Sequence, residues 1–319
     1  MNGTVLIGNT SGIGIKLGNN TILKNGIIRN YSTGIRLENS NNSTVSNNTI
    51  SNNYYGIYVN SSSNNNLTSN TANDNLFVGI ILDFNNSNNT LRNNIINHNG
   101  YGIYLYLSKS NILTNNTANN NIHTGIYLQS SNSTTLTNNT ANNNNYYGIY
   151  LQSSTSTTLT NNTANNNNYY GIFLYLSNSS TLINNIVNNN ADTGLYLHSS
   201  SNSMLTANNM TGNTYNLWAY DQYMITQNIS DTNLAEGKPI YWLNGISDAV
   251  YSDVGLFVCL SCNNVTVTNS SITRAYYGIY LNNTNNSYVT NINVSNSYEG
   301  IRLKQSYNNI ITNNIVNNN

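Results

Sequence analysis

The stretch QSSNSTTLTNNTANNNNYYGIYL at residues 129–151 is followed at once by QSSTSTTLTNNTANNNNYYGIFL at residues 152–174. The Gly-Ile dipeptide near the end of each copy recurs along most of the chain with a period of 22–23 residues. A period of this length is typical of stacked repeat proteins, in which each unit completes its core against its neighbours. The sequence therefore predicts a solenoid.

Each repeat predicts three short strands. Apolar, aromatic and apolar residues follow the Gly in turn, which is the period-2 alternation of a strand with one buried face. A second apolar position, Leu136 in the first copy, comes about eleven residues after the preceding Gly, and a third, Ala141, about five residues later. Corners rich in Asn, Ser and Thr separate these strands and leave no room for a helix. We expect an all-β fold, a parallel β-helix with one coil per repeat.

The crossover rule for parallel strands predicts a right-handed β-helix. Its 22–23 residues per coil give about 13 coils, and a rise of about 4.8 Å per coil gives a rod of about 60 Å. Asn makes up about a quarter of the chain. It tolerates the left-handed backbone conformation at corners, and stacked Asn side chains can form hydrogen-bonded ladders.

Two other folds compete for this composition. Chains rich in Asn, Ser and Thr are commonly disordered, but here Ile, Leu and Val occupy fixed repeat positions. A leucine-rich repeat has a similar period, but its Leu-x-x-Leu-x-Leu core is absent from this sequence. The repeat indicates a single β-helix domain over residues 1–319, with an irregular insertion at residues 219–250 where the pattern fails and the sole proline, Pro239, occurs.

The charge pattern excludes several classes of partner. Ten basic and ten acidic residues in 319 give no basic field for nucleic acid and no polybasic patch for a membrane surface. The sequence contains no 18-residue apolar segment and no secretory signal peptide, so we expect the mature form if the protein is secreted. Asn-x-Ser/Thr sequons permit glycosylation, but this composition produces many of them by chance.

An aromatic ladder is the first candidate interaction surface. The residue two positions after each Gly is expected to point outward and to stack on its equivalents in neighbouring coils. Such a row favours the binding of sugar rings or of a second copy of the chain. The alternative is that the row has no partner and only stabilises the strands through stacking. The predicted ladder comprises Tyr58, Tyr104, Tyr127, Tyr150, Phe173, Tyr196 and Tyr280.

Acidic residues form the alternative site. Half of all the acidic residues lie within the 33 residues in which the repeat fails. Paired carboxylates there could act as acid and base in sugar cleavage or bind Ca²⁺, although no calcium-loop motif is present. An irregular loop explains them equally well. These residues are Asp221, Asp231, Glu236, Asp248 and Asp253.

Cys259 and Cys262 form a single C-x-x-C pair. One pair is at most half a zinc site, so a local or intermolecular disulfide is expected, with Cys259 pointing outward. The three His residues fall at different repeat positions, which argues against a copper site. We predict no metal, no cofactor and no established catalytic set.

The repeats, together with the segment DTNLAEGKPIYW at residues 231–242, resemble the archaeal cell-surface β-helix proteins of the NosD-like group with carbohydrate-binding and sugar-hydrolase (CASH) domains. The resemblance implies a right-handed β-helix at the outside of an archaeal cell. It carries over no catalytic residues and no copper ligands.

These observations favour a structural or adhesive cell-surface protein. We expect it to associate with copies of itself, end to end or face to face, into a fibre, sheath or surface layer, because both ends of the sequence stop within the repeat. The alternative is a β-helix that binds or cleaves carbohydrate, with polysaccharide as its partner.

Overall fold

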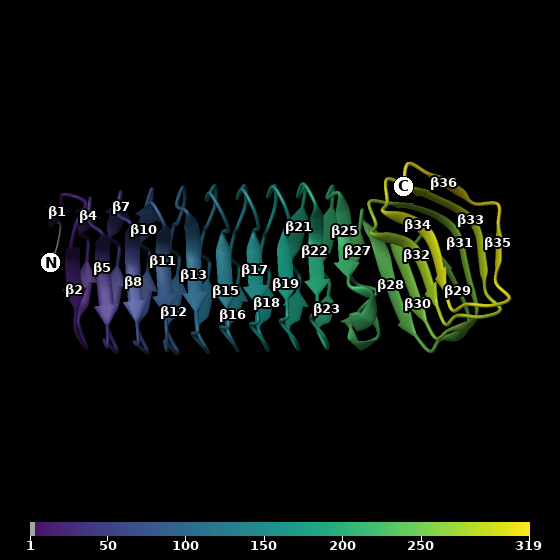
Figure 1. Cartoon of the computed structure of the whole chain (residues 1–319), viewed down its shortest axis with the longest axis horizontal. Coiled ribbons are helices and arrows are strands. Elements are labelled where there is room, and N and C mark those ends of the chain that lie inside the picture. The colour runs from purple at the N-terminus through teal and green to yellow at the C-terminus, as the bar shows by residue number, and fades with distance from the viewer. Residues whose placement is uncertain (1–3) are drawn as a thin grey trace.

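The computed structural model describes residues 4–319. It confirms the predicted fold class: the chain winds into an all-β parallel β-helix of about 14 coils, close to the expected 13 (Figure 1). Among the described residues, the only helical segment is the short 3₁₀ helix η1 (Asp221–Thr226).

The first face of the N-terminal stack is a ten-stranded parallel sheet formed by the strands that carry Gly-Ile. Equivalent residues pair in register, so that Ile103 faces Ile126 and Ile126 faces Ile149. The strands are β2 (Ile13–Leu17), β5 (Thr33–Glu38), β8 (Tyr55–Asn60), β11 (Val78–Asp83), β13 (Tyr101–Tyr106), β15 (Ile126–Gln129), β17 (Ile149–Gln152), β19 (Ile172–Tyr175), β22 (Thr193–His198) and β25 (Tyr215–Ala219).

The other two faces are built from strands of two or three residues. The second face contains β3 (Ile22–Lys24), β6 (Thr44–Ser46), β9 (Asn66–Thr68), β12 (Thr90–Arg92), β14 (Ile112–Thr114), β16 (Thr135–Thr137), β18 (Thr158–Thr160), β20 (Thr181–Ile183), β23 (Met204–Thr206) and β26 (Asn228–Ile229). The third face contains β1 (Val5–Ile7), β4 (Ile27–Arg29), β7 (Thr49–Ser51), β10 (Thr71–Asn73), β21 (Ile186–Asn188), β24 (Asn209–Thr211) and β27 (Leu234–Ala235). Single bridges at Ile95, Thr117, Thr140 and Thr163 continue it through the middle coils.

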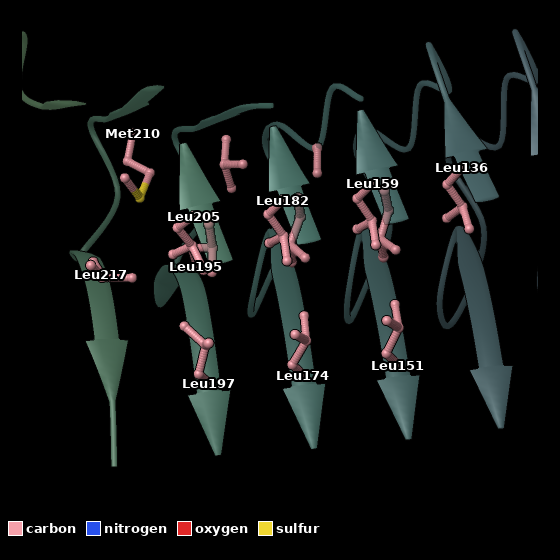
Figure 2. Close-up of a cluster of buried hydrophobic side chains, with 14 of the residues drawn as sticks. Leu136, Leu151, Leu159, Leu174, Leu182, Leu195, Leu197, Leu205, Met210 and Leu217 are labelled. Carbon is pink, nitrogen blue, oxygen red and sulfur yellow. The ribbon is translucent and has the colours of Figure 1, made fainter. Parts of the chain in front are cut away.

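The core consists of columns of apolar side chains that run along the axis. Figure 2 shows Leu151 and Leu174 of the first face in one row, and Leu136 and Leu159 of the second face in another. These side chains are fully buried, and the small Ala141 completes the coil from the third face. Apolar side chains from all three faces therefore fill the interior of the coil.

The Gly of the repeat occupies a position where the backbone of the next coil approaches closely. A Cβ at Gly102 would lie 2.4 Å from the carbonyl oxygen of Gly125 and 2.9 Å from the Asn121 side-chain amide. No side chain fits there, which explains why the Gly-Ile dipeptide marks each coil.

Buried asparagines form ladders at two corners, as predicted. In one ladder the amide Nδ2 of Asn116 donates to Oδ1 of Asn139 at 3.0 Å, and Nδ2 of Asn139 donates to Oδ1 of Asn162 at 3.0 Å. The backbone N–H of each Asn donates to the same oxygen one coil further on, as from Asn116 to Asn139 at 3.0 Å. The corner backbone therefore has hydrogen-bond partners in the absence of water.

The N-terminal stack ends where the chain turns into a second stack, and we call this junction the corner between the stacks. After η1, the antiparallel strands β27 and β28 (Lys238–Asn244) form a hairpin whose turn residues, Glu236 and Gly237, both have positive φ. The chain then starts a second stack, and Figure 1 shows its strands turned relative to those of the first. Regular strands thus resume at Lys238, inside the segment predicted to be irregular.

The C-terminal stack has less regular coils. Its first coil is short, since Ile240 pairs with Leu256 only 16 residues later. One side consists of β28, β30 (Leu256–Leu260), β32 (Tyr277–Asn282) and β34 (Glu299–Lys304). The other consists of β29 (Ser247–Ser252), β31 (Asn263–Thr273), β33 (Tyr288–Ser295), β35 (Ile310–Thr312) and β36 (Ile315–Asn317).

Candidate binding surface on the aromatic face

The outward side of the first face carries a continuous ladder of stacked rings. The ring centroids of Tyr104 and Tyr127 are 4.7 Å apart, and those of Tyr127 and Tyr150 are 4.8 Å apart, with ring planes within 4° in both pairs. Phe173 and Tyr196 continue the row at 4.9 and 5.0 Å. Five of the seven predicted ladder residues therefore lie in one stack, which we call the aromatic ladder.

The ladder continues beyond the residues that the repeat predicted. Trp218 stacks on Tyr196 at 4.1 Å, and Tyr276 of the C-terminal stack covers the other face of the indole at 3.9 Å. Trp218 was not among the predicted ladder residues, because that prediction counted from the Gly of each coil and Asn216 replaces the Gly in this one. Its spacing of 22 residues from Tyr196 was the signal that could have found it.

Tyr58 and Tyr280 lie outside the stack. Ile81 stands between Tyr58 and Tyr104 in the register, and the Tyr58 hydroxyl donates to Asp83 at 2.5 Å. Tyr280 is fully buried in the C-terminal stack, where its ring stacks on Tyr277 at 5.0 Å. Tyr280 therefore presents no exposed surface.

The ladder rings cover one another's faces and turn their edges outward. Burial raises the pKa of the Tyr104 phenol to about 12, and it raises the pKa of Tyr127 and Tyr150 further. The phenols therefore remain neutral at physiological pH. The hydroxyls of Tyr104 and Tyr127 donate to the side-chain oxygens of Gln129 and Gln152, one coil further on.

Beside the ladder lies a hollow of about 260 Å³ whose lining is largely aromatic. It opens where Thr124 replaces the aromatic residue that precedes the Gly in neighbouring coils. Its lining residues are Tyr101, His123, Thr124, Tyr127, Tyr146, Tyr147 and Tyr150.

Two further hollows lie near this face. One of about 320 Å³ is at the corner between the stacks, lined by Trp218, Tyr220, Gln222, Tyr276, Tyr277 and Lys304. A larger one of about 450 Å³ lies at the corner that follows the first face, near Lys109, and short Asn and Ser side chains form most of its lining. Of these three hollows, the one at Thr124 has aromatic walls and no Lys, Arg, Asp or Glu in its lining, whereas each of the other two contains a Lys.

The structure gives four of the five acidic candidates separate polar partners. Asp253 pairs with Lys238 at 3.0 Å, and Asp248 accepts from Asn264 Nδ2 at 2.7 Å. Glu236 accepts from the Gly212 N–H at 2.7 Å and from Asn216 Nδ2 at 3.1 Å, which ties the hairpin turn to the N-terminal stack.

Asp231 is exposed and contacts Ser230. The side chain of Asp221 lies outside the part that the structure describes. Among the remaining four carboxylates, no hydrogen bond or ion pair links one to another. The geometry thus gives no support to a paired acid and base.

Cys259 and Cys262 form a disulfide. Cys259 points inward and is fully buried, so its predicted outward position is wrong. The reason is a shift of one residue: Phe257 pairs with Ile279, which places Phe257 and Cys259 on the core side of β30.

A family model described as periplasmic copper-binding protein (NosD) matches residues 85–241 and 241–319. These two matches together span most of the chain. The chain belongs to the NosD family. A second model, described as right-handed β-helix region, matches residues 2–140 of this NosD-family chain and agrees with the predicted handedness. The archaeal source and the carbohydrate-binding subgroup of the predicted resemblance remain predictions.

Several solved structures are similar to this chain at low sequence identity. The Dettilon tailspike protein is 14% identical with a TM-score of 0.52, over 95% of this chain and 61% of the tailspike. The A-module of the Azotobacter vinelandii mannuronan C-5 epimerase AlgE6 is 14% identical with a TM-score of 0.46, over 99% of this chain and 79% of the module. PfbA, a surface adhesin of Streptococcus pneumoniae, is 10% identical with a TM-score of 0.48, over 98% of this chain and 81% of the adhesin. No curated protein matches the sequence.

The family description mentions copper, but the residues of this chain do not fit a copper centre. Copper sites in proteins use clustered His, Cys and Met ligands. Here His123 packs between Tyr101 and Tyr146, His198 lies against Tyr175, and both cysteines are in the disulfide. Among the side chains that the structure describes, no three His, Cys, Asp or Glu come together as a metal site.

The residues from 4 to 319 include no helix of the length and apolar character that a bilayer-spanning segment requires.

Proposed function

We propose that this NosD-family protein binds neutral polysaccharide on the aromatic face of its N-terminal stack. The observation that carries the proposal is the hollow beside the ladder, in which tyrosines surround a space of about 260 Å³ without a charged Lys, Arg, Asp or Glu side chain. Binding sites for small molecules are commonly concave and aromatic, with a few polar groups that orient the ligand.

The chemistry of this face suits sugars. Tyrosine offers an apolar ring to the C–H groups of a pyranose and a hydroxyl to its oxygens. Tyr146 and Tyr169 stand 42% and 46% exposed on consecutive coils, so an extended polymer could contact several coils at once. Such repeated weak contacts raise the overall affinity for a polymer.

We place the protein outside the cytoplasm, at the cell surface or in the periplasm. The family description names the periplasm, and the disulfide between Cys259 and Cys262 fits an oxidising compartment.

The test is affinity electrophoresis of the full chain in gels that contain neutral glucan, mannan or galactan, or the acidic polymers alginate and pectate. We expect at least one neutral polymer to retard the protein, and the variant Tyr146→Ala/Tyr169→Ala to be retarded less. The control is Tyr288→Ala/Tyr307→Ala, which removes two exposed tyrosines from the C-terminal stack. Absence of retardation by every polymer would refute carbohydrate binding.

Self-association is the second candidate, and the exposed tyrosines of the aromatic face favour it. Tyr146 and Tyr169 are 42% and 46% exposed on consecutive coils, and the same face of a second copy of the chain could cover them. Sedimentation velocity over a range of concentrations should show growing assemblies, and Tyr146→Lys/Tyr169→Lys should remain monomeric. A wild-type chain that is monomeric at every concentration would exclude this candidate.

A further inference from the structure

The column of residues that precede the Gly on the first face contains a gap at Thr124. The N–H of Gly102 donates to the carbonyl of Thr124, and the N–H of Gly125 donates to that of Tyr147. Tyr101 and Tyr147 therefore lie one coil to either side of Thr124.

The next step of the same column shows what a filled position looks like. Tyr147 and Tyr170 stack face to face, with centroids 5.4 Å apart and ring planes within 5°. Thr124 has no ring to place against the opposite face of Tyr147. That face of Tyr147 therefore borders the hollow, with the buried Thr124 as its floor.

The spacing of the coils sets the size of the gap. Two coil steps separate Tyr101 from Tyr147 by about 9.6 Å along the axis. A ring between two walls needs about 3.5–4.0 Å of contact distance on each side. One ring fits this space and two do not. The volume of about 260 Å³ is correspondingly smaller than a typical pocket for a drug-sized ligand.

We propose that the Thr124 gap binds one pyranose ring of a neutral glycan, inserted between Tyr101 and Tyr147 where an aromatic side chain is missing. This inference rests on the proposed function and adds a subsite and a class of sugar to it. Tyr127, Tyr150, His123 and Tyr146 complete the lining. The His123 ring lies against Tyr101, with centroids 4.8 Å apart, so that it forms part of the wall on that side.

Two aromatic walls select the configuration of the sugar. A β-gluco-configured pyranose carries its substituents equatorially, so both of its faces present axial C–H groups to the walls. A galacto-configured ring carries its C4 oxygen axially, as a hydroxyl in the terminal ring and as the glycosidic oxygen within a β-1,4-linked chain, and this oxygen would be pressed against one aromatic wall. Burying a polar oxygen there without a hydrogen-bond partner is unfavourable. The gap should therefore prefer gluco over galacto rings.

The test is isothermal titration of the full chain with cellotetraose and with β-1,4-linked galactotetraose. We expect the wild type to bind cellotetraose at least tenfold more tightly. Thr124→Tyr supplies the missing ring, so it should abolish cellotetraose binding while its thermal midpoint stays equal or rises. The control is Thr135→Tyr, the same substitution in the same coil on the second face, and it should bind as the wild type does.

A second variant keeps the proposal testable if Thr124→Tyr does not fold. Tyr147→Leu removes one wall but keeps an apolar side chain, and it should weaken cellotetraose binding at least tenfold. If folded Thr124→Tyr binds cellotetraose like the wild type, the subsite is refuted. Retardation of the wild type in polysaccharide gels would still support the proposed function in that case. If the wild type binds galactotetraose as tightly, the two-walled geometry is wrong.

Discussion

The two stacks of the molecule differ in the hydrogen bonds at their corners and in the side chains that fill their cores. In the N-terminal stack, coils of 22–23 residues repeat one contact pattern, and asparagine amides bond from coil to coil at the corners. In the C-terminal stack, the corners use hydroxyls such as those of Thr284 and Ser287, and the core contains the larger Phe257 and Tyr280. The amide ladders of the N-terminal stack thus give way to hydroxyl contacts and a disulfide in the C-terminal stack, and Asn side chains accept corner N–H groups again in its last coil, at Asn309, Asn314 and Asn319.

The largest expected effect comes from breaking one rung of the amide ladder. The Asn139 side chain makes four buried hydrogen bonds, whereas the Ser287 hydroxyl makes two. We expect Asn139→Ala to lower the free energy of unfolding by about 4 kcal/mol and Ser287→Ala by about 2 kcal/mol, because buried groups lose their partners. Denaturant unfolding followed by circular dichroism measures both. Equal losses would mean that the two kinds of corner are equivalent.

The second effect concerns the corner that joins the stacks. Trp218 is stacked between Tyr196 and Tyr276, so Trp218→Ala should cost about 3 kcal/mol and loosen the joint. We expect calorimetry to resolve two transitions for this variant. The matched control, Tyr150→Ala, removes a ladder ring far from the corner and should leave the number of transitions unchanged. A Trp218→Ala profile as cooperative as that of the wild type would show that other contacts couple the stacks.

One such contact is the hydrogen bond from Arg274 Nη1 to the carbonyl of Asn213, at 3.0 Å. The N–H of Asn216 also donates to the carbonyl of Arg274 at 2.7 Å. Arg274→Ala added to Trp218→Ala should therefore separate the transitions further.

A smaller effect is expected from the disulfide. It closes a loop of only a few residues, so Cys259→Ala/Cys262→Ala should lower stability by about 2 kcal/mol. Hydrogen exchange measured by mass spectrometry should increase in residues 238–319 and stay unchanged in residues 33–190. Faster exchange throughout the chain would contradict a local role for this bond.

The smallest effect is the alkaline sensitivity of one ladder phenol. Burial raises the pKa of Tyr104 to about 12, above the value of about 10 in an unfolded chain. The raised pKa adds to the free energy of unfolding. This added stability is complete below pH 10 and is lost as the pH rises from 10 to 12, because the unfolded state releases its proton first. Tyr104→Phe should therefore lose less stability than the wild type between pH 9 and 11. Since Tyr104 is partly exposed, we expect a difference well below about 1.4 kcal/mol per pH unit.

The sequence was sufficient for the features that repeat with the coil. The Gly-Ile period predicts the first-face strands, the buried columns and the row of rings from Tyr104 to Tyr196, because parallel register places equivalent residues side by side. Contacts that depend on the corner could not be predicted in this way. Trp218 meets Tyr276 only because the hairpin at Glu236 redirects the chain.

A one-residue shift accounts for the error at Cys259. Counting from Gly255 places Phe257 outward, yet Phe257 and not Leu256 pairs with Ile279, because this coil has 22 residues while Gly255 and Gly278 are 23 residues apart. In a strand, a shift of one residue exchanges the two faces. The gap at Thr124, by contrast, is visible in an alignment of the repeats, and its hollow becomes evident only when the neighbouring tyrosines are placed in space.

The near-identical coils at residues 129–151 and 152–174 have a consequence for how such a protein can change during evolution. Each coil contacts the next through the same leucines, rings and amides, so a duplicated coil brings compatible surfaces to both of its neighbours. Gain or loss of one whole unit would alter the rod by about 4.8 Å and leave every type of contact intact. Genetic duplication can therefore adjust the reach of the molecule in uniform steps, without any compensating mutation in its core.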